Sequence, residues 1–436
     1  MYFHSLYVSA NVLGMIGYSC YILADTFFVA RGIGSDAIAA LNLVLPAFSL
    51  LNGTGLMIGM GAAARYSLSS GRADSEIHRT IFTQALQLAF VAMLFFFSIG
   101  LFFARPLCVL LGADGTTLPH AIPYIRILLM FSPLFLCNNL LNCFVRNDGE
   151  PRLSMTAMLV GSLTNIVLDI AFVIGLHMGV AGAALATILS QALSAVLVLW
   201  VLMRTKDMHR LELRKIRFDG RMFHRIIRIG LPAGLQSVMY TSSNILIQSS
   251  VNALGTDTVA AWTAYSKIDS LFWMIVNAFG ISITTFVGQN YGAGKMDRVH
   301  KGVRTCMGIT AGATVLLSVI LYNYASICYQ LFTTDAQVVV IGEQILHFLV
   351  PTYFTYIAIE ILSGTLRGIG DSWLPMIICC LGICALRVVW ILTAVPLKND
   401  ILTIVFSYPL TWTVTSIAFI VYYLFFSRLK IVGRKR

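Results

Sequence analysis

The chain contains the stretch Tyr21-Ile-Leu-Ala-Asp-Thr-Phe-Phe-Val-Ala-Arg-Gly-Ile-Gly-Ser-Asp-Ala-Ile-Ala-Ala40, which ends the first long apolar segment. One carboxylate, Asp25, lies in it among Ile, Leu, Phe and Val residues. An ionisable group inside a membrane span costs about 2.5–3.5 kcal/mol on insertion scales and usually has a function. Asp25 is therefore either a functional acid or an acid that reaches the membrane surface from near a helix end.

The composition excludes an ordinary soluble domain. The 436 residues are 58% hydrophobic and 11% charged, whereas soluble domains are about 25% charged. Apolar stretches lie near residues 4–31, 37–64, 80–103, 121–145, 153–175, 180–203, 224–250, 258–287, 302–325, 338–363, 374–395 and 401–427. Each is long enough to cross about 30 Å of hydrocarbon, where only a helix pairs its backbone groups internally. We expect an all-α integral membrane protein with 12 transmembrane helices.

The second half of the chain repeats the first. One constant shift without gaps superimposes Gly34-Ser-Asp-Ala-Ile-Ala-Ala40 on Gly255-Thr-Asp-Thr-Val-Ala-Ala261, Gly71 on Gly292, and Arg146-Asn-Asp-Gly-Glu150 on Arg367-Gly-Ile-Gly-Asp371. Six spans in each copy make both enter the membrane in the same sense, and a binding site is expected between or within such copies. The sequence predicts two pseudo-symmetric six-helix bundles: an N-terminal lobe (1–203), a basic cytoplasmic linker (204–223) and a C-terminal lobe with a basic tail (224–436).

The net charge of +11 is distributed unevenly between the two sides of the membrane. With the first loop outside, 24 of the 30 Lys and Arg residues fall in cytoplasmic loops and the C-terminal tail, while Arg31, Arg105 and Lys398 fall outside. This asymmetry predicts a multi-pass protein of the cell (inner) membrane with both termini in the cytoplasm. The basic surface then faces anionic lipid headgroups, and a nucleic-acid partner is not expected.

Three further polar residues reach about the depth of Asp25. At 1.5 Å per helical residue, Asp25 and Asp169 each lie about 9 Å below the outer surface, and Thr187 about 10 Å below it. Asn165 precedes Asp169 by four residues, so both lie on one helix face. Oxygen-rich groups of this kind suit small hard cations, and a close pair of carboxylates tends to hold a proton.

A structural interpretation of the same four residues stays open. Polar side chains hydrogen-bond between helices in membranes, and Asn165 and Thr187 alone would more often serve that purpose. The agreement in depth of Asp25 with Asp169 favours a shared functional site.

The C-terminal lobe has its own intramembrane charges: Lys267, Asp269, Glu360 and Arg387. Because an unpaired charge in hydrocarbon is costly, their opposite signs suggest a network in which they neutralise each other. A role of Glu360 in proton or substrate binding is the alternative.

Several motifs together resemble the multidrug and toxic compound extrusion (MATE) family, and the prokaryotic DNA-damage-inducible branch fits best. They are Ala24-Asp-Thr-Phe-Phe-Val-Ala-Arg31, Gly230-Leu-Pro-Ala-Gly234, Gly288-Gln-Asn-Tyr-Gly-Ala-Gly-Lys295 and Leu366-Arg-Gly-Ile-Gly-Asp371. In that branch an acid on helix one, an Asn and an Asp on helix five and a Thr on helix six form a cation site. These match Asp25, Asn165, Asp169 and Thr187, and the likeness adds an asparagine of helix four, here Asn142.

The resemblance implies a transporter rather than an enzyme, with no cofactor. It implies export of lipophilic, often cationic compounds by alternating access against inward flow of H⁺ and/or Na⁺. The four residues of the cation site would bind Na⁺ if sodium is the coupling ion. We also expect a monomer in the lipid bilayer. The alternative from the same superfamily is a flippase for lipids or lipid-linked oligosaccharides, which would need a wide and strongly cationic cavity.

Overall fold

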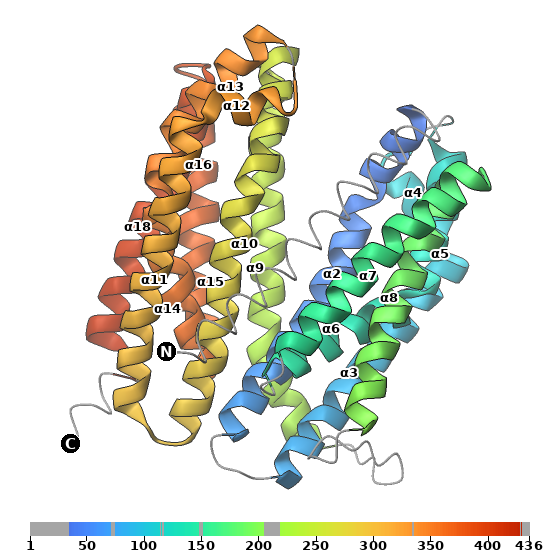
Figure 1. Ribbon diagram of the computed structural model, residues 1–436, viewed down its shortest axis with the longest axis vertical. Coiled ribbons are helices and arrows are strands. Elements are labelled where there is room, and N and C mark those ends of the chain that lie inside the picture. Colours follow the sequence, from blue (N-terminus) through green and yellow to red (C-terminus); the bar gives the residue numbers. More distant parts are fainter. Residues whose placement is uncertain are drawn as a thin grey trace. The chain divides into compact units, whose positions relative to one another are not determined.

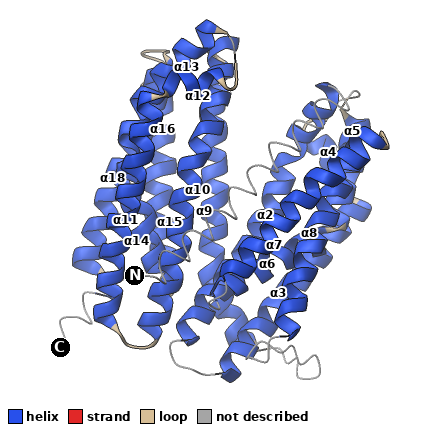
Figure 2. Cartoon of the chain, in the orientation of Figure 1, coloured by secondary structure: helices blue, strands red, loops and turns tan. Residues whose placement is uncertain are grey.

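The computed structural model describes residues 35–70, 75–113, 115, 117–147, 151–204, 219–333, 335–427 and 429. The first expected span, with Asp25, lies outside them. Within the described ranges the chain forms helices joined by loops and contains no strand (Figure 2). It divides into two compact units, Met1–Gly234 and Leu235–Arg436.

The first unit is a bundle of long helices (Figure 1). Its elements are α2 (Ser35–Ser70), α3 (Ser75–Phe102), α4 (Ala104–Leu110), α5 (Leu118–Met130), α6 (Ser132–Asn147), α7 (Pro151–Asp169), the π-helical turn η1 (Ile170–Gly175) and α8 (Gly179–Arg204). α2 packs along α6, and α7 packs along α8, which also contacts α6. α9 (Gly220–Asn252) begins in this unit and continues into the second.

The second unit is built around α10 (Thr256–Gly292), which contacts several neighbours. The other elements are α11 (Met296–Asn323), α12 (Ala325–Gln330), α13 (Ala336–Leu349), the 3-10 turn η3 (Val350–Tyr356), α14 (Ile357–Gly368), α15 (Trp373–Cys379), the π-helical turn η4 (Cys380–Ala385), α16 (Leu386–Thr393), α17 (Ile401–Val405), α18 (Ser407–Val421) and the π-helical turn η5 (Tyr422–Phe426). α10 packs against α11, α13 and α14.

The helix boundaries confirm the internal repeat. The shift that places Gly34 on Gly255 also places the start of α2 on the start of α10, and both ends of α3 on both ends of α11. The turn before α10 shows one requirement of the repeated motif: Gly255 has φ +104°, a conformation that is free of steric strain only for glycine. One sequence pattern therefore folds twice into the same order of helices.

Eleven of the twelve expected spans correspond to described helices. Judged by length and apolar composition, nine of the described helical segments can cross a membrane, or ten if the pair Leu118–Met130 and Ser132–Val145, bent by 51°, forms one span. α9 is not among them because Gln236, Asn244 and Gln248 lower its hydropathy. Asn244 and Gln248 reappear below in the lining of a cavity.

Apolar side chains cover the outside of the first unit as well as its core. Leu51 and Ile81 are fully buried, whereas Phe90, Phe95 and Leu110 are 59%, 60% and 82% exposed. A soluble protein rarely exposes many large apolar groups together, and such surfaces indicate a contact with lipid or protein. The helices therefore pack by their inner faces while their outer faces suit hydrocarbon.

Candidate functional site

Three of the four residues expected to bind a cation lie together in the first unit. Asp169 is the last residue of α7, Asn165 lies one turn earlier, and Thr187 projects from α8, which packs along α7. Asp169, Asn165 and Thr187 are only 0%, 1% and 6% exposed. Residues four apart share a helix face, so α7 presents its carboxylate and its amide to α8.

Hydrogen bonds connect the three residues through Asn165. The orientation of a side-chain amide is assigned from its hydrogen-bond partners. One of the two orientations of the Asn165 amide gives both its nitrogen and its oxygen a partner. Its nitrogen then donates to Asp169 Oδ2 at 3.1 Å, and its oxygen accepts from the Thr187 backbone N–H at 3.3 Å. The Thr187 hydroxyl donates to the Ala183 carbonyl at 3.0 Å. The arrangement is a carboxylate, an amide and a hydroxyl gathered at a buried point between two helices.

The backbone changes its geometry directly after the carboxylate. η1 begins at Ile170, next to Asp169. η1 ends at Gly175, before the loop that leads to α8. Val173 of η1 packs with Val180 and Ala183 of α8, so the polar cluster borders an apolar one. The carboxylate of Asp169 therefore lies at the border between a polar cluster and an apolar one.

The sequence also predicted Asp25 and Asn142 at this site. Asp25 lies outside the described residues. Asn142 belongs to a separate cluster: its amide donates to the Asn138 carbonyl at 2.9 Å and side-chain oxygen at 2.8 Å, and accepts from Ser154 Oγ at 2.9 Å. Asn138 in turn donates to Gln191 Oε1. The structure therefore does not bring Asn142 into contact with the Asp169 group.

The Asn138 cluster was missed by the sequence analysis. It joins α6, α7 and α8 through amides and a hydroxyl, and Asn139 beside it donates to Asn52 of α2 at 3.1 Å. The available signal was the group of three asparagines, Asn138, Asn139 and Asn142, within one apolar span. Hydrogen bonds of this kind hold membrane helices together.

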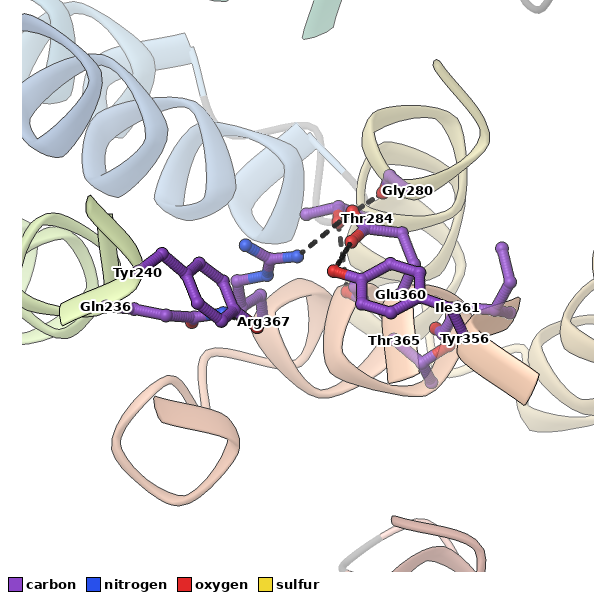
Figure 3. A network of polar contacts seen from close by, with 10 residues as sticks. Gln236, Tyr240, Gly280, Thr284, Tyr356, Glu360, Ile361, Thr365 and Arg367 are labelled. Carbon is purple, nitrogen blue, oxygen red and sulfur yellow. Dashed lines mark hydrogen bonds and ion pairs between the residues drawn. The ribbon is translucent and has the colours of Figure 1, made fainter. Parts of the chain in front are cut away.

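The four intramembrane charges predicted for the C-terminal lobe do not form one network of ion pairs. Glu360 pairs with Arg367, at 3.6 Å between Oε1 and Nη2, and also accepts from the Tyr356 hydroxyl at 3.4 Å (Figure 3). Lys267 forms no ion pair in the part of the chain that the structure describes, and Asp269 and Arg387 have neutral partners. The prediction that these four charges neutralise one another in a single network is therefore wrong.

Glu360 fits its place because of a glycine on the neighbouring helix. A Cβ added at Gly280 of α10 would collide with Oε1 of Glu360. It would also lie only 2.8 Å from the Cδ and the Cγ of Glu360. Gly364 and Gly368 of α14 lie equally close to the α10 backbone: their Cβ positions would be 2.9 Å from the Gly280 carbonyl and 2.7 Å from the Thr284 carbonyl. Small residues let membrane helices approach this closely.

Asp269 is held by three donors with aromatic rings. The hydroxyls of Tyr265 and Tyr353 donate to Oδ1 at 3.1 and 2.7 Å. The indole N–H of Trp273 donates to Oδ2 at 2.7 Å. Hydrogen bonds to a charged acceptor are stronger than neutral ones, so the surrounding rings stabilise the carboxylate without a cation.

Arg387 and Asp269 line one cavity of 440 Å³ in the second unit. The other lining residues are mainly polar or aromatic: Tyr240, Asn244, Ile247, Gln248, Trp262, Tyr265, Ser266, Trp273, Tyr356, Ile383, Tyr408 and Trp412. A volume of this size is typical of small-molecule sites. Three polar side chains of α9 face this cavity, which accounts for the low hydropathy of that helix.

A family model for MatE matches residues 11–171 and 232–393. The chain belongs to this family. The two matches begin at positions related by the shift of the internal repeat, so each covers one copy. Members of the MATE family are transporters, and the chain is therefore a membrane transporter and not an enzyme.

Curated relatives extend over much of the chain. The probable multidrug resistance protein YoeA of Bacillus subtilis is 25% identical over 435 residues, which cover 98% of this chain and 93% of that protein. The FAD transporter of Shewanella oneidensis is 26% identical over 336 residues, with coverages of 75% and 73%. The multidrug export protein MepA of Staphylococcus aureus is 24% identical over 354 residues, with coverages of 81% and 78%.

Solved structures share the fold. An outward-facing multidrug resistance MATE transporter of the MOP superfamily superimposes with a TM-score of 0.93 at 23% identity, covering 99% of this chain and 96% of that one. A MOP transporter from Pyrococcus furiosus, described as having a binding pocket of reverse polarity, gives a TM-score of 0.91 at 23% identity, covering 100% and 96%. The fold is the twelve-helix MATE fold, as expected from the sequence.

Proposed function

We propose that this transporter is an antiporter, which exports lipophilic small molecules by alternating access and couples their export to inward flow of H⁺ or Na⁺. The coupling ion would bind at Asp169, Asn165, Thr187 and Asp25. The observation that carries the proposal is the buried contact of Asp169, Asn165 and Thr187 on two packed helices. Multidrug relatives such as YoeA and MepA support small-molecule substrates.

The coupling follows from the charge of the site. In the ion-free state Asp169 carries a negative charge in apolar surroundings, which favours uptake of a proton or Na⁺ from outside. Binding neutralises the site and changes how α7, α8 and the Asp25 segment pack. Ion and substrate are coupled only if each binds the two conformations with different affinity. We propose that the ion-loaded form has the lower affinity for substrate and returns inward.

Two further assignments belong to the same proposal. The excess of Lys and Arg in alternate loops supports cytoplasmic termini and insertion into the cell membrane, and we expect the transporter to work as a monomer. The flippase alternative is less favoured, because the described lining of the cavity in the second unit has one guanidinium and one carboxylate. A strongly cationic cavity would suit a pyrophosphate-linked lipid better.

The test is dye efflux from proteoliposomes with the proton gradient and the sodium gradient imposed separately. We expect efflux to respond to at least one gradient in the wild type. Asp169→Asn and Asp25→Asn should each abolish gradient-driven efflux while the protein remains folded, because a neutral amide cannot take up the coupling charge. Asp257→Asn is the matched control, since Asp257 is an exposed acid at the start of α10. Normal gradient-driven efflux by Asp169→Asn would disprove the coupling site.

A further inference from the structure

The cavity of the second unit contains a buried cation that has no anionic partner among the described residues. Arg387 is 3% exposed. Its Nη1 donates to Asn244 Oδ1 at 3.2 Å and to Ser243 Oγ at 3.4 Å, which are long bonds to neutral acceptors. Its Nε has no hydrogen-bond partner in the described part of the chain, and no ion pair joins Arg387 to an acid there.

The ring of Tyr408 compensates only part of this charge. The guanidinium carbon lies 4.3 Å from the ring centre, a cation–π contact that also leaves the edge of the guanidinium available for hydrogen bonds. A buried charge is normally paired and fully hydrogen-bonded, since leaving it uncompensated is strongly destabilising. An anion that enters the cavity would supply the missing partner.

The carboxylate of the same cavity does not take that place among the described residues. Both oxygens of Asp269 already accept hydrogen bonds from Tyr265, Tyr353 and Trp273. The acceptors of the acid are thus engaged within the protein, whereas donors of the guanidinium remain available. This asymmetry favours an anionic ligand over a cationic one.

The walls of the cavity suit a flat ring. Trp262 stacks on Tyr265, with ring centres 5.0 Å apart and an angle of 24° between the planes. Trp412 contacts the rings of Tyr408 at 5.4 Å and Tyr356 at 5.7 Å, both close to edge-on. These rings line the cavity, and aromatic side chains favour offset-stacked or edge-to-face contacts with a further ring.

We propose that this cavity binds planar aromatic anions, with the ring between the Trp and Tyr side chains and the anionic group on Arg387. A guanidinium binds carboxylate, sulfonate or phosphate groups through two parallel N–H donors. The proposal deepens the proposed function by naming a substrate class, and it depends on that function only for the transport of the bound molecule. Binding itself is measured without any gradient.

The experiment is isothermal titration calorimetry on the full chain in lipid nanodiscs, with empty nanodiscs as the blank. Three probes share one ring: naphthalene-2-sulfonate, 2-naphthylmethanol and 2-naphthylmethylammonium. We expect the sulfonate to bind about tenfold or more tightly than the neutral alcohol, as for a charge-assisted hydrogen bond. Arg387→Gln should remove this preference and leave the affinity for the alcohol within about twofold, because the aromatic walls remain.

The control variant is Lys267→Gln, which removes another cation from a helix of the unit and does not line the cavity. It should keep the preference for the sulfonate. If Arg387→Gln does not fold, Arg387→Lys replaces it: a lysine keeps the charge but loses the planar pair of donors, so an intermediate preference is expected.

Two results would overturn the proposal. One is equal affinity for sulfonate and alcohol in the wild type, which would make Arg387 only a clamp between α16 and α9. The other is tightest binding of the ammonium probe with its loss in Asp269→Asn, which would make the cavity a site for organic cations. Asp169→Asn should bind the sulfonate normally, so a failed coupling mechanism would leave this result unaffected.

Discussion

At the scale of single residues, the neighbours of a charge decide its role more than its sign does. Glu360 has an arginine beside it, Asp269 has three aromatic donors, and Arg387 has a ring and two weak acceptors. Each arrangement satisfies the side chain to a different degree. The least satisfied of the three, Arg387, is therefore the one assigned to a ligand.

Gly280 is a residue at which one methyl group should matter. We expect Gly280→Ala to lower the free energy of unfolding by about 1–3 kcal/mol, because the new Cβ would overlap the Glu360 carboxylate and force a shift. Thermal unfolding in detergent is the measurement. Gly308→Ala in α11 is the control, since no described atom lies within 4 Å of its Cβ position; it should be neutral or slightly stabilising. Equal melting temperatures for the two variants would show that α10 and α14 have room to separate.

At the scale of elements, α9 differs from a simple membrane helix. Its first part packs on α2 in the first unit, where Gly61 and Gly230 let the two backbones come close, and its later part supplies polar side chains to the cavity of the second unit. The compact units divide inside this helix, after Gly234, whereas the sequence suggested a boundary at 204–223. α9 therefore combines a packing role and a lining role along its length.

The contact of α2 with α9 leads to a second substitution test. A Cβ at Gly61 would lie 2.5 Å from the Ile226 carbonyl and 3.0 Å from Gly230 Cα, so Gly61→Ala has to move backbone rather than a flexible side chain. We expect a loss of about 1–3 kcal/mol in stability, measured by thermal unfolding, together with lower transport. Gly53→Ala on the same helix has open space around it among the described residues and should not be destabilised. A stable Gly61→Ala would mean that the two helices are not in close contact.

At the scale of the whole molecule, the repeat and the uneven distribution of charge predict the orientation of the chain in the bilayer. Three expected spans, 302–325, 338–363 and 374–395, separate the turn at Gly292–Met296 from the loop containing Lys398, so the two should lie on opposite sides of the membrane. The basic residues around the first of these predict that it lies in the cytoplasm.

Cysteine labelling tests this orientation. We expect a membrane-impermeant maleimide to label Lys398→Cys in intact cells and to label Lys295→Cys only after permeabilisation. Both positions are exposed, and the wild type provides the background from native cysteines. The reverse pattern of labelling would contradict cytoplasmic termini.

The sequence by itself determined the architecture and part of the candidate site. In hydrocarbon the backbone must pair internally, so long apolar stretches are helices, and a constant shift between the two halves implies two copies of one bundle. The four-residue spacing of Asn165 and Asp169 places them on one helix face. The depth of Thr187 along its own span predicts that it lies at the same level in the membrane. These features depend on local periodicity and length alone.

Only the tertiary structure decided the partners of the other polar groups. The Tyr353 bond to Asp269 joins residues 84 apart, and the Asn244 bond to Arg387 joins residues 143 apart. Such contacts depend on how each helix is rotated about its axis and which neighbour it meets, and a rotation of one residue position turns a side chain by about 100°. Hydropathy carries no such information, so the sequence predicted ion pairs where the fold instead built an aromatic cavity around an arginine that no described acid neutralises.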